Sequence, residues 1–190
     1  MKSKQIVEVA LNYFSYYGYK GTTLTKIAES VGIKTPSLYA HFKSKQDIFF
    51  ACLSYSLEND YNFLKNSLIV NKMETPKQTL YNLLINYDKR VHDNTISMFC
   101  LRMLYLPPNY FESQLIEETN KRLENMRKLL DPVFKEAYDR NDLKVEVDEA
   151  VEAYLCLFDG LVIELLYTNR ESFQYRLEAS WHVFSHGLFL

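Results

Sequence analysis

Glycine and proline are scarce in this 190-residue chain, which has five of each. Because these residues are the main breakers of regular structure, their scarcity predicts long helices joined by short connections. Cysteine is scarce as well, and Cys52, Cys100 and Cys156 lie far apart with no CxxC pair. This pattern is typical of buried free thiols in a reducing compartment and not of a disulfide framework.

Long hydrophobic runs are also missing. The longest uncharged stretch, residues 179–190, has 12 residues and is too short to span a bilayer. Glu8 interrupts the first apolar stretch, so we expect no secretory signal. We therefore expect a soluble, cytoplasmic protein that does not bind a membrane.

Motifs of the common enzyme classes are absent. The chain contains no nucleophile elbow, P-loop, HExxH or GxGxxG motif, so we expect neither catalysis nor a cofactor. His182 and His186 are four residues apart and follow Glu178 by one turn, a spacing that suits a metal ion. No fourth ligand accompanies them, and histidine is favoured near a helix C-terminus, so we expect no metal site.

Charge is distributed unevenly along the chain. Residues 1–50 hold seven lysines and three acidic residues, a net charge of +4, and they contain no arginine. The remaining residues hold 15 basic and 21 acidic side chains, a net charge of −6. A basic head on an acidic body indicates that only the head meets a polyanion.

The head carries the signals of short helices. Apolar residues recur at helical spacing over residues 6–17, and Gly18 stands where a helix ends in a left-handed residue. A second helix fits residues 23–31, with a threonine N-cap at position 22 or 23 and Gly32 at its end.

Two further helices are predicted by capping signals. Thr35 is expected to cap a third helix, with Pro36 at its first position and Leu38 and Phe42 as apolar anchors. The Ser44–Asp47 segment has the form of a capping box and predicts the start of a fourth helix.

The second and third helices, joined through residues 31–34, have the arrangement of a helix-turn-helix. Lys45 stands at a helix N-terminus, where the dipole and the ammonium group both favour a phosphate. The alternative is a generic helical bundle whose lysines are merely solvated. The hydroxyls, the phenol and the imidazole of the third helix can reach base edges and phosphates in a DNA major groove. The residues that this helix presents are Thr35, Pro36, Ser37, Tyr39, Ala40 and His41.

These residues resemble the DNA-binding domain of the tetracycline-repressor (TetR) family. The runs GTTLTKIA (21–28), VGI (31–33) and SLYAHFKSK (37–45) carry the anchors of the family pattern. Lys34 and Ala40 depart from this pattern. Arginine is the residue that most often recognises guanine, and residues 1–50 contain none, so the operator sequence cannot be predicted. The resemblance implies DNA contacts from Thr25, Lys26, Thr35, Pro36, Ser37, Tyr39, His41 and Lys45.

The body continues the helical pattern. Helices are predicted over residues 45–71, 75–91, 96–106, 109–138, 148–168 and 171–189. We therefore expect an all-α fold of about nine helices. A helix-turn-helix, three-helix DNA-binding domain (1–46) is followed by a helical effector-binding and dimerisation domain (47–190).

The segment from Val151 to Tyr167 is apolar nearly all round, which requires burial on both sides. One side suits the core of the chain and the other a second copy, and Gly160 would permit close approach of another helix. We expect a two-fold homodimer through a four-helix bundle, as the resemblance also implies. The expected interface residues are Leu161, Leu165, Trp181, Phe184 and Leu188.

Aromatic and methionine side chains are dense in the middle helices, and the resemblance implies an effector site there. The alternative is that they simply fill the core. Asp159 and Glu164 stand in an apolar helix and either neutralise a cationic ligand or form hydrogen bonds across the dimer interface. The candidate pocket residues are Tyr61, Tyr87, Met98, Phe99, Met103, Tyr105, Met126, Tyr154 and Phe158.

The sequence thus predicts a ligand-responsive transcriptional repressor with three partners: a palindromic double-stranded DNA operator, a hydrophobic or amphipathic small molecule, and a second copy of the chain. In the mechanism that the resemblance implies, the effector moves the long helix that starts at Lys45, and the dimer leaves DNA. Two alternatives remain: a regulator or activator without a ligand, and a helical lipid- or small-molecule-binding module with weak DNA contact.

Overall fold

The computed structural model describes residues 2–70 and 74–190. This part of the chain folds into nine α-helices and one short 3-10 helix, with no strand beyond an isolated bridge between Leu143 and Phe189, which confirms the all-α prediction. The predicted end of the fourth helix, near Asn71, lies outside the described residues. The elements are α1 (Lys2–Gly21), α2 (Leu24–Val31), α3 (Thr35–Leu38), α4 (Lys45–Val70), α5 (Pro76–Asp93), α6 (Thr95–Tyr105), η2 (Asn109–Phe111), α7 (Glu112–Asp139), α8 (Val147–Tyr167) and α9 (Arg170–Leu188).

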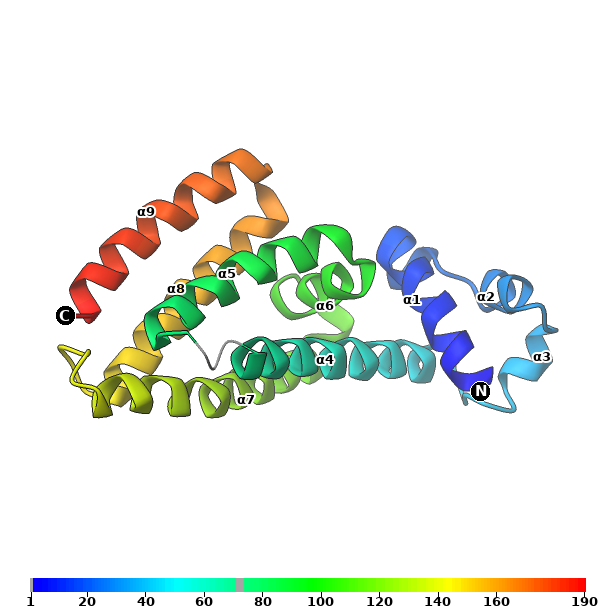
Figure 1. Cartoon of the computed structure of the whole chain (residues 1–190). Coiled ribbons are helices and arrows are strands. Elements are labelled where there is room, and N and C mark those ends of the chain that lie inside the picture. The colour runs from blue at the N-terminus through cyan, green and yellow to red at the C-terminus, as the bar shows by residue number, and fades with distance from the viewer. Residues whose placement is uncertain (1, 71–73) are drawn as a thin grey trace.

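The molecule is elongated, with a small head at one end (Figure 1). Helices α1, α2 and α3 form the head, and α4 runs from the head along the body beside α7. Helices α5, α6 and α8 complete the body, and α9 lies at its far end. No helix in the described ranges is long and apolar enough to cross a membrane.

Local capping explains several of the helix ends in the head. Gly32 follows the end of α2 with a φ of +74°, whereas Gly18, predicted to end the first helix, lies at a kink inside α1 with a φ of +66°; both adopt the positive φ that glycine allows most easily. The Thr23 hydroxyl accepts a hydrogen bond from the Lys26 amide at 3.3 Å and caps α2. The Ser44 hydroxyl likewise accepts from the Asp47 amide at 3.1 Å and opens α4.

The third helix departs from the prediction. Lys34, and not Thr35, is its N-cap: the Lys34 backbone is extended, and its carbonyl accepts a hydrogen bond from the Ser37 amide at 2.8 Å. Thr35 and Pro36 therefore occupy the first two helical positions, where a missing amide proton costs little. The helix is a single turn that ends at Leu38, so Phe42 packs against the head from the connection that follows.

The head core extends into the body. Ile6, Phe14 and Leu38 are buried in it together with Phe49 from the second turn of α4. Phe99 from α6 and Phe111 from η2 belong to the same core, with ring centroids 5.9 and 5.0 Å from that of Phe49. The expected domain boundary between residues 46 and 47 falls in the first turn of α4, a helix that the head and the body share.

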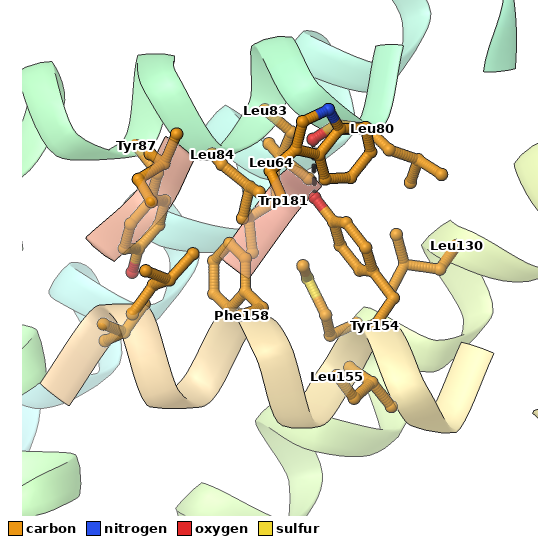
Figure 2. Close-up of a cluster of buried hydrophobic side chains, with 14 of the residues drawn as sticks. Leu64, Leu80, Leu83, Leu84, Tyr87, Leu130, Tyr154, Leu155, Phe158 and Trp181 are labelled. Atoms are coloured by element: carbon orange, nitrogen blue, oxygen red, sulfur yellow. Dashed lines mark hydrogen bonds between the residues drawn. The ribbon is translucent and has the colours of Figure 1, made fainter. Parts of the chain in front are cut away.

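A second apolar cluster fills the body (Figure 2). The fully buried Tyr154 of α8 donates a hydrogen bond from its hydroxyl to the Leu80 carbonyl of α5 at 2.7 Å. This hydrogen bond satisfies a polar group that would otherwise destabilise the core.

The three cysteines do not share one environment. Cys52 and Cys100 are buried free thiols, as expected, but Cys156 is exposed. The prediction of a buried thiol was wrong for Cys156 because this residue lies on the solvent-exposed side of α8.

Candidate nucleic-acid interface and effector site

The face of the helix-turn-helix that surrounds Leu38 is exposed. Leu38 itself is buried and anchors α3, whereas the Tyr39 side chain is 57% exposed. Thr35 is half-buried, and the other expected DNA contacts of α2 and α3 are open to solvent: Thr25, Lys26, Pro36, Ser37, Tyr39 and His41. The arrangement leaves hydroxyls, a phenol and an imidazole free to meet base edges and phosphates.

Two of the expected DNA-binding lysines lie over tyrosine rings. The Lys26 ammonium is 5.3 Å from the ring centroid of Tyr17, and the Lys45 ammonium is 4.5 Å from that of Tyr19. Partial burial lowers the pKa of Lys45 from its ordinary value. These cation–π contacts restrict where the ammonium groups point. Sequence reasoning missed both tyrosines, although they flank Gly18 next to the helix-turn-helix.

His41 has a partner that the sequence did not indicate. Its Nδ1 atom lies 3.2 Å from the Ser3 hydroxyl, which comes from the first turn of α1. The contact links His41, which follows α3, to α1 and restricts the orientation of the imidazole.

A buried polar cluster joins α4, α5 and α7 in the body. The Asp60 carboxylate accepts hydrogen bonds from Arg122 Nε at 2.9 Å and from the Tyr87 hydroxyl at 2.8 Å. Arg122 Nη2 also donates to the Tyr87 hydroxyl oxygen at 3.2 Å. Asp60 is 1% exposed and Arg122 7% exposed. The three residues therefore satisfy one another's hydrogen-bonding groups away from water.

This environment changes the proton affinities of the cluster. Burial, the largest single influence, opposes the charged guanidinium, but the Asp60 carboxylate together with Tyr87, Tyr105 and Cys100 outweighs it and raises the pKa of Arg122 above its ordinary value. Burial, reinforced by the Asp60 charge, also raises the pKa of Tyr87. Sequence reasoning missed Asp60 and Arg122. A signal existed for Asp60, which lies between Leu57 and Leu64 on the apolar side of its helix.

Both carboxylates that were singled out in α8 have partners within the chain. Asp159 accepts a hydrogen bond from the Tyr105 hydroxyl at 2.5 Å, and its Oδ1 atom lies 4.0 Å from Arg122 Nη1. Burial raises the pKa of Tyr105, so its hydroxyl stays protonated. Glu164 forms an ion pair with Arg176 of α9. The other oxygen of Glu164, Oε2, is buried without a hydrogen-bond partner.

A cavity of about 70 Å³ lies between α4 and α7 beside this cluster. Of the expected pocket residues, Tyr61 and Met126 line it directly. The cavity is lined by Leu57, Asp60, Tyr61, Leu64, Glu118, Lys121, Arg122, Asn125 and Met126.

The other expected pocket residues fall into separate groups. Tyr87 contacts Asp60, and Phe158 packs edge-on against Tyr87 with ring centroids 4.9 Å apart, so both lie behind the cavity wall. Tyr154 is part of the body core. Four more expected residues lie elsewhere: Phe99 and Met103 pack in the head core, Met98 lines a more open groove between α1 and α6, and Tyr105 contacts Asp159.

The expected dimer residues face the core of their own chain, which is a correction. Leu161, Leu165, Trp181 and Leu188 are at most 8% exposed, and the partly buried Phe184 packs on Trp181. Helix α8 has two apolar sides, and the remaining body helices cover the side that carries these leucines.

The opposite side of α8 and α9 is open. Ile163, Tyr167, Tyr175 and Val183 are 41%, 67%, 77% and 72% exposed. A side chain added at Gly160 would meet no atom of the chain within 4 Å. These exposed apolar residues of α8 and α9, together with Gly160, are named here the outer α8–α9 face.

The histidine pair of α9 has local partners. The rings of His182 and His186 are 4.3 Å apart, and His186 Nδ1 contacts the His182 carbonyl. Glu178 accepts a hydrogen bond from the Tyr81 hydroxyl at 2.6 Å. Within residues 2–70 and 74–190, no three His, Cys, Asp or Glu side chains are grouped closely enough to hold a metal ion.

Comparison with known proteins decides the family. Residues 6–52 match the family model described as "Bacterial regulatory proteins, tetR family". Over 147 residues, which are 75% of each protein, the chain is 32% identical to the biofilm operon icaADBC HTH-type negative transcriptional regulator IcaR of Staphylococcus epidermidis. The chain belongs to the TetR family.

Other TetR-family proteins match over nearly the whole chain. The IcaR regulator of Staphylococcus aureus strain NCTC 8325 is 26% identical over 172 residues, covering 90% of this chain and 87% of the relative. The solved TetR-family regulator of Cytophaga hutchinsonii has a TM-score of 0.77 at 19% identity and covers 99% of this chain and 94% of its own. The family consists of DNA-binding transcriptional regulators and not of enzymes.

Proposed function

We propose that this TetR-family protein is a repressor that binds a palindromic operator as a homodimer and leaves it when a small apolar or amphipathic molecule binds in the body. The observation that carries the proposal is α4, which begins at the expected phosphate contact Lys45 and reaches the cavity at Asp60. The IcaR relative, named as a negative transcriptional regulator, supports repression over activation.

The DNA contacts follow from the exposed face of the head, residues 1–46. Lys45 binds a phosphate at the N-terminus of α4, and the ring of Tyr19 orients its ammonium group. Phosphate contacts position the head, and contacts to base edges select the sequence. We assign both kinds of contact to Thr25, Lys26, Thr35, Pro36, Ser37, Tyr39 and His41.

The body, residues 47–190, forms the dimer through the outer α8–α9 face. Gly160 lets the two copies of α8 approach, and Ile163 and Val183 supply apolar area that water otherwise covers. A two-fold axis through this face places the two heads side by side. The heads then match successive major grooves, about 34–36 Å apart.

Helix α4 couples the two functions. Asp60 lies 15 residues after Lys45, a helical rise of about 22 Å. A ligand that tilts α4 at the cavity therefore displaces the head and changes the spacing between the two recognition helices. Release from DNA requires only that the ligand bind the displaced conformation more tightly than the DNA-bound one.

The test is a fluorescence-anisotropy titration of the full chain with duplex DNA from its own promoter region and with random duplex, each at two salt concentrations. Tight and selective binding by a dimer supports the proposal. Equal and weak binding to both duplexes contradicts it and favours a small-molecule-binding module. A transcription assay with the bound promoter then separates a repressor from an activator without a ligand.

A further inference from the structure

The short helix η2 is a segment of the body that packs against the head. Pro107 and Pro108 follow α6 and cannot continue it; Pro108 is the N-cap of η2, and its carbonyl accepts a hydrogen bond from the Phe111 amide at 2.9 Å. Within this single turn, the ring centroids of Tyr110 and Phe111 lie 4.8 Å apart. Phe111 is 5% exposed and belongs to the head core, whereas Tyr110 is 44% exposed. The body therefore supplies two aromatic rings to the head.

Both of these rings contact Tyr19 of α1. The ring centroid of Tyr19 lies 5.4 Å from that of Tyr110 and 4.9 Å from that of Phe111. Within the head, the rings of Phe14 and Phe49 lie 5.9 and 5.3 Å from the same centroid. Rings from α1, α4 and η2 thus surround Tyr19, and contacts of this kind restrict the orientation of an aromatic side chain.

Tyr19 in turn contacts Lys45, the expected phosphate contact at the start of α4. The Lys45 ammonium lies 4.5 Å from the ring centroid of Tyr19, and no carboxylate of the described residues forms an ion pair with it. A lysine side chain is flexible, so a contact that orders its ammonium group before binding reduces the entropy lost when a phosphate binds. The orientation of the Tyr19 ring therefore affects how readily Lys45 binds DNA.

We propose that Tyr110 is a positioning residue for DNA binding: it packs against Tyr19 and thereby holds the Lys45 ammonium where a backbone phosphate meets the N-terminus of α4. This inference rests on the proposed function, because it takes Lys45 as a phosphate contact. The connection between α6 and α7 then contributes to DNA affinity through the head. Tyr110 is the residue to test, because a substitution at the buried Phe111 would disturb the head core itself.

A second lysine provides a competing explanation for any effect of Tyr110. The Lys20 ammonium lies 5.5 Å from the ring centroid of Tyr110, so loss of this ring frees Lys20 as well as Tyr19. If Lys20 or Tyr110 bound DNA directly, the loss would weaken binding even in a chain without Lys45. If Tyr110 acts through Lys45, it would not.

The first experiment is a fluorescence-anisotropy titration of the full chain with promoter duplex and with random duplex. Tyr110→Ala should weaken binding to both duplexes by about two- to fivefold, the equivalent of an exposed cation–π contact, because phosphate contacts do not depend on sequence. Tyr110→Phe keeps the ring and should bind like the native chain. Tyr138→Ala removes a tyrosine of α7 that is also 44% exposed and should have no effect. Native affinity in Tyr110→Ala overturns the proposal.

Combination with Lys45→Ala tests whether Tyr110 acts through this lysine. Lys45→Ala should weaken binding by itself, and the addition of Tyr110→Ala should then cause no further loss. A further loss as large as that in the native background overturns the assignment and indicates a direct DNA contact of Lys20 or Tyr110.

A measurement without DNA follows the position of Lys45 itself. Lysines that carry [13C]methyl groups after reductive methylation give separate NMR signals, and the Lys45 signal is the one missing from Lys45→Ala. Because an aromatic ring shields nuclei above its face, this signal should lie upfield of those of exposed lysines in the native chain. It should move toward them in Tyr110→Ala, whose fold circular dichroism checks. A native signal among those of exposed lysines, or one that Tyr110→Ala leaves in place, overturns the proposal.

The two measurements separate this inference from the proposed function. Selective operator binding that Tyr110→Ala leaves unchanged refutes the inference and leaves the proposed function intact. Equal and weak binding to both duplexes refutes the proposed function, whereas movement of the Lys45 signal in Tyr110→Ala still supports Tyr110 as the residue that positions Lys45.

Discussion

The Asp60–Arg122 pair allows a quantitative test of the body core. Replacing Arg122 with Met leaves the Asp60 carboxylate, which is 1% exposed, with the Tyr87 hydroxyl as its remaining hydrogen-bond donor. Replacing Asp60 with Leu leaves the buried guanidinium without its hydrogen-bonded carboxylate, with Asp159 4.0 Å away. Breaking a buried pair from one side costs about 3–5 kcal/mol, so each single variant should lose that much unfolding free energy.

The double variant should lose much less than the sum. With Asp60→Leu and Arg122→Met combined, no uncompensated charge is buried, and the Tyr87 hydroxyl is the polar group left without these partners. An unsatisfied buried hydroxyl costs about 1–3 kcal/mol, so we expect a total loss of that size. The coupling between the two sites is then at least about 3 kcal/mol.

Urea unfolding followed by circular dichroism measures these free energies. The protein concentration must be held constant because the proposed dimer links stability to concentration. Arg140→Met, which breaks an exposed pair with Glu136, is the matched control and should cost less than about 1 kcal/mol. Additive losses in the double variant, or single losses as small as that of the control, would refute the description of a buried and mutually satisfied pair.

Three further predictions concern DNA binding and assembly. Tyr39→Ala should weaken operator binding by about 1–3 kcal/mol in an anisotropy titration, and Tyr138→Ala, which removes an exposed tyrosine of α7, should not. Lys45→Ala should reduce the slope of log affinity against log salt by about one unit on every duplex; a changed base preference alone would contradict the phosphate assignment. Ile163→Glu should convert dimer to monomer in analytical ultracentrifugation, whereas the comparably exposed Ile116→Glu should leave the dimer intact; a dimer in both would exclude the outer α8–α9 face.

The head could be predicted almost completely because its signals are local. Helix caps and glycine turns depend on hydrogen bonds between residues that are close in sequence, such as Thr23 with Lys26 or Ser44 with Asp47. The family motif adds its own fixed spacing. The wrong cap at Thr35 shows the limit: lysine is not a preferred N-cap residue, yet the extended backbone at Lys34 places the start of α3 one residue before the predicted cap.

The body could be predicted in outline only. Periodicity placed the helices, and it correctly gave α8 two apolar sides. It did not say which side the chain itself would cover, so the sequence offered Leu161 to a second copy, whereas the structure buries Leu161 and exposes Ile163, two residues away. The difference depends on the direction from which the other body helices pack, and that information is spread over the whole domain.

The sequence by itself thus determined the fold class and the helix-turn-helix, because these follow from short-range patterns. Only the tertiary structure brought Asp60 to Arg122, 62 residues further along the chain, and placed both beside a cavity. A charged residue on the apolar side of a helix indicates that a buried partner is required, but the packing of distant helices decides which residue that partner is.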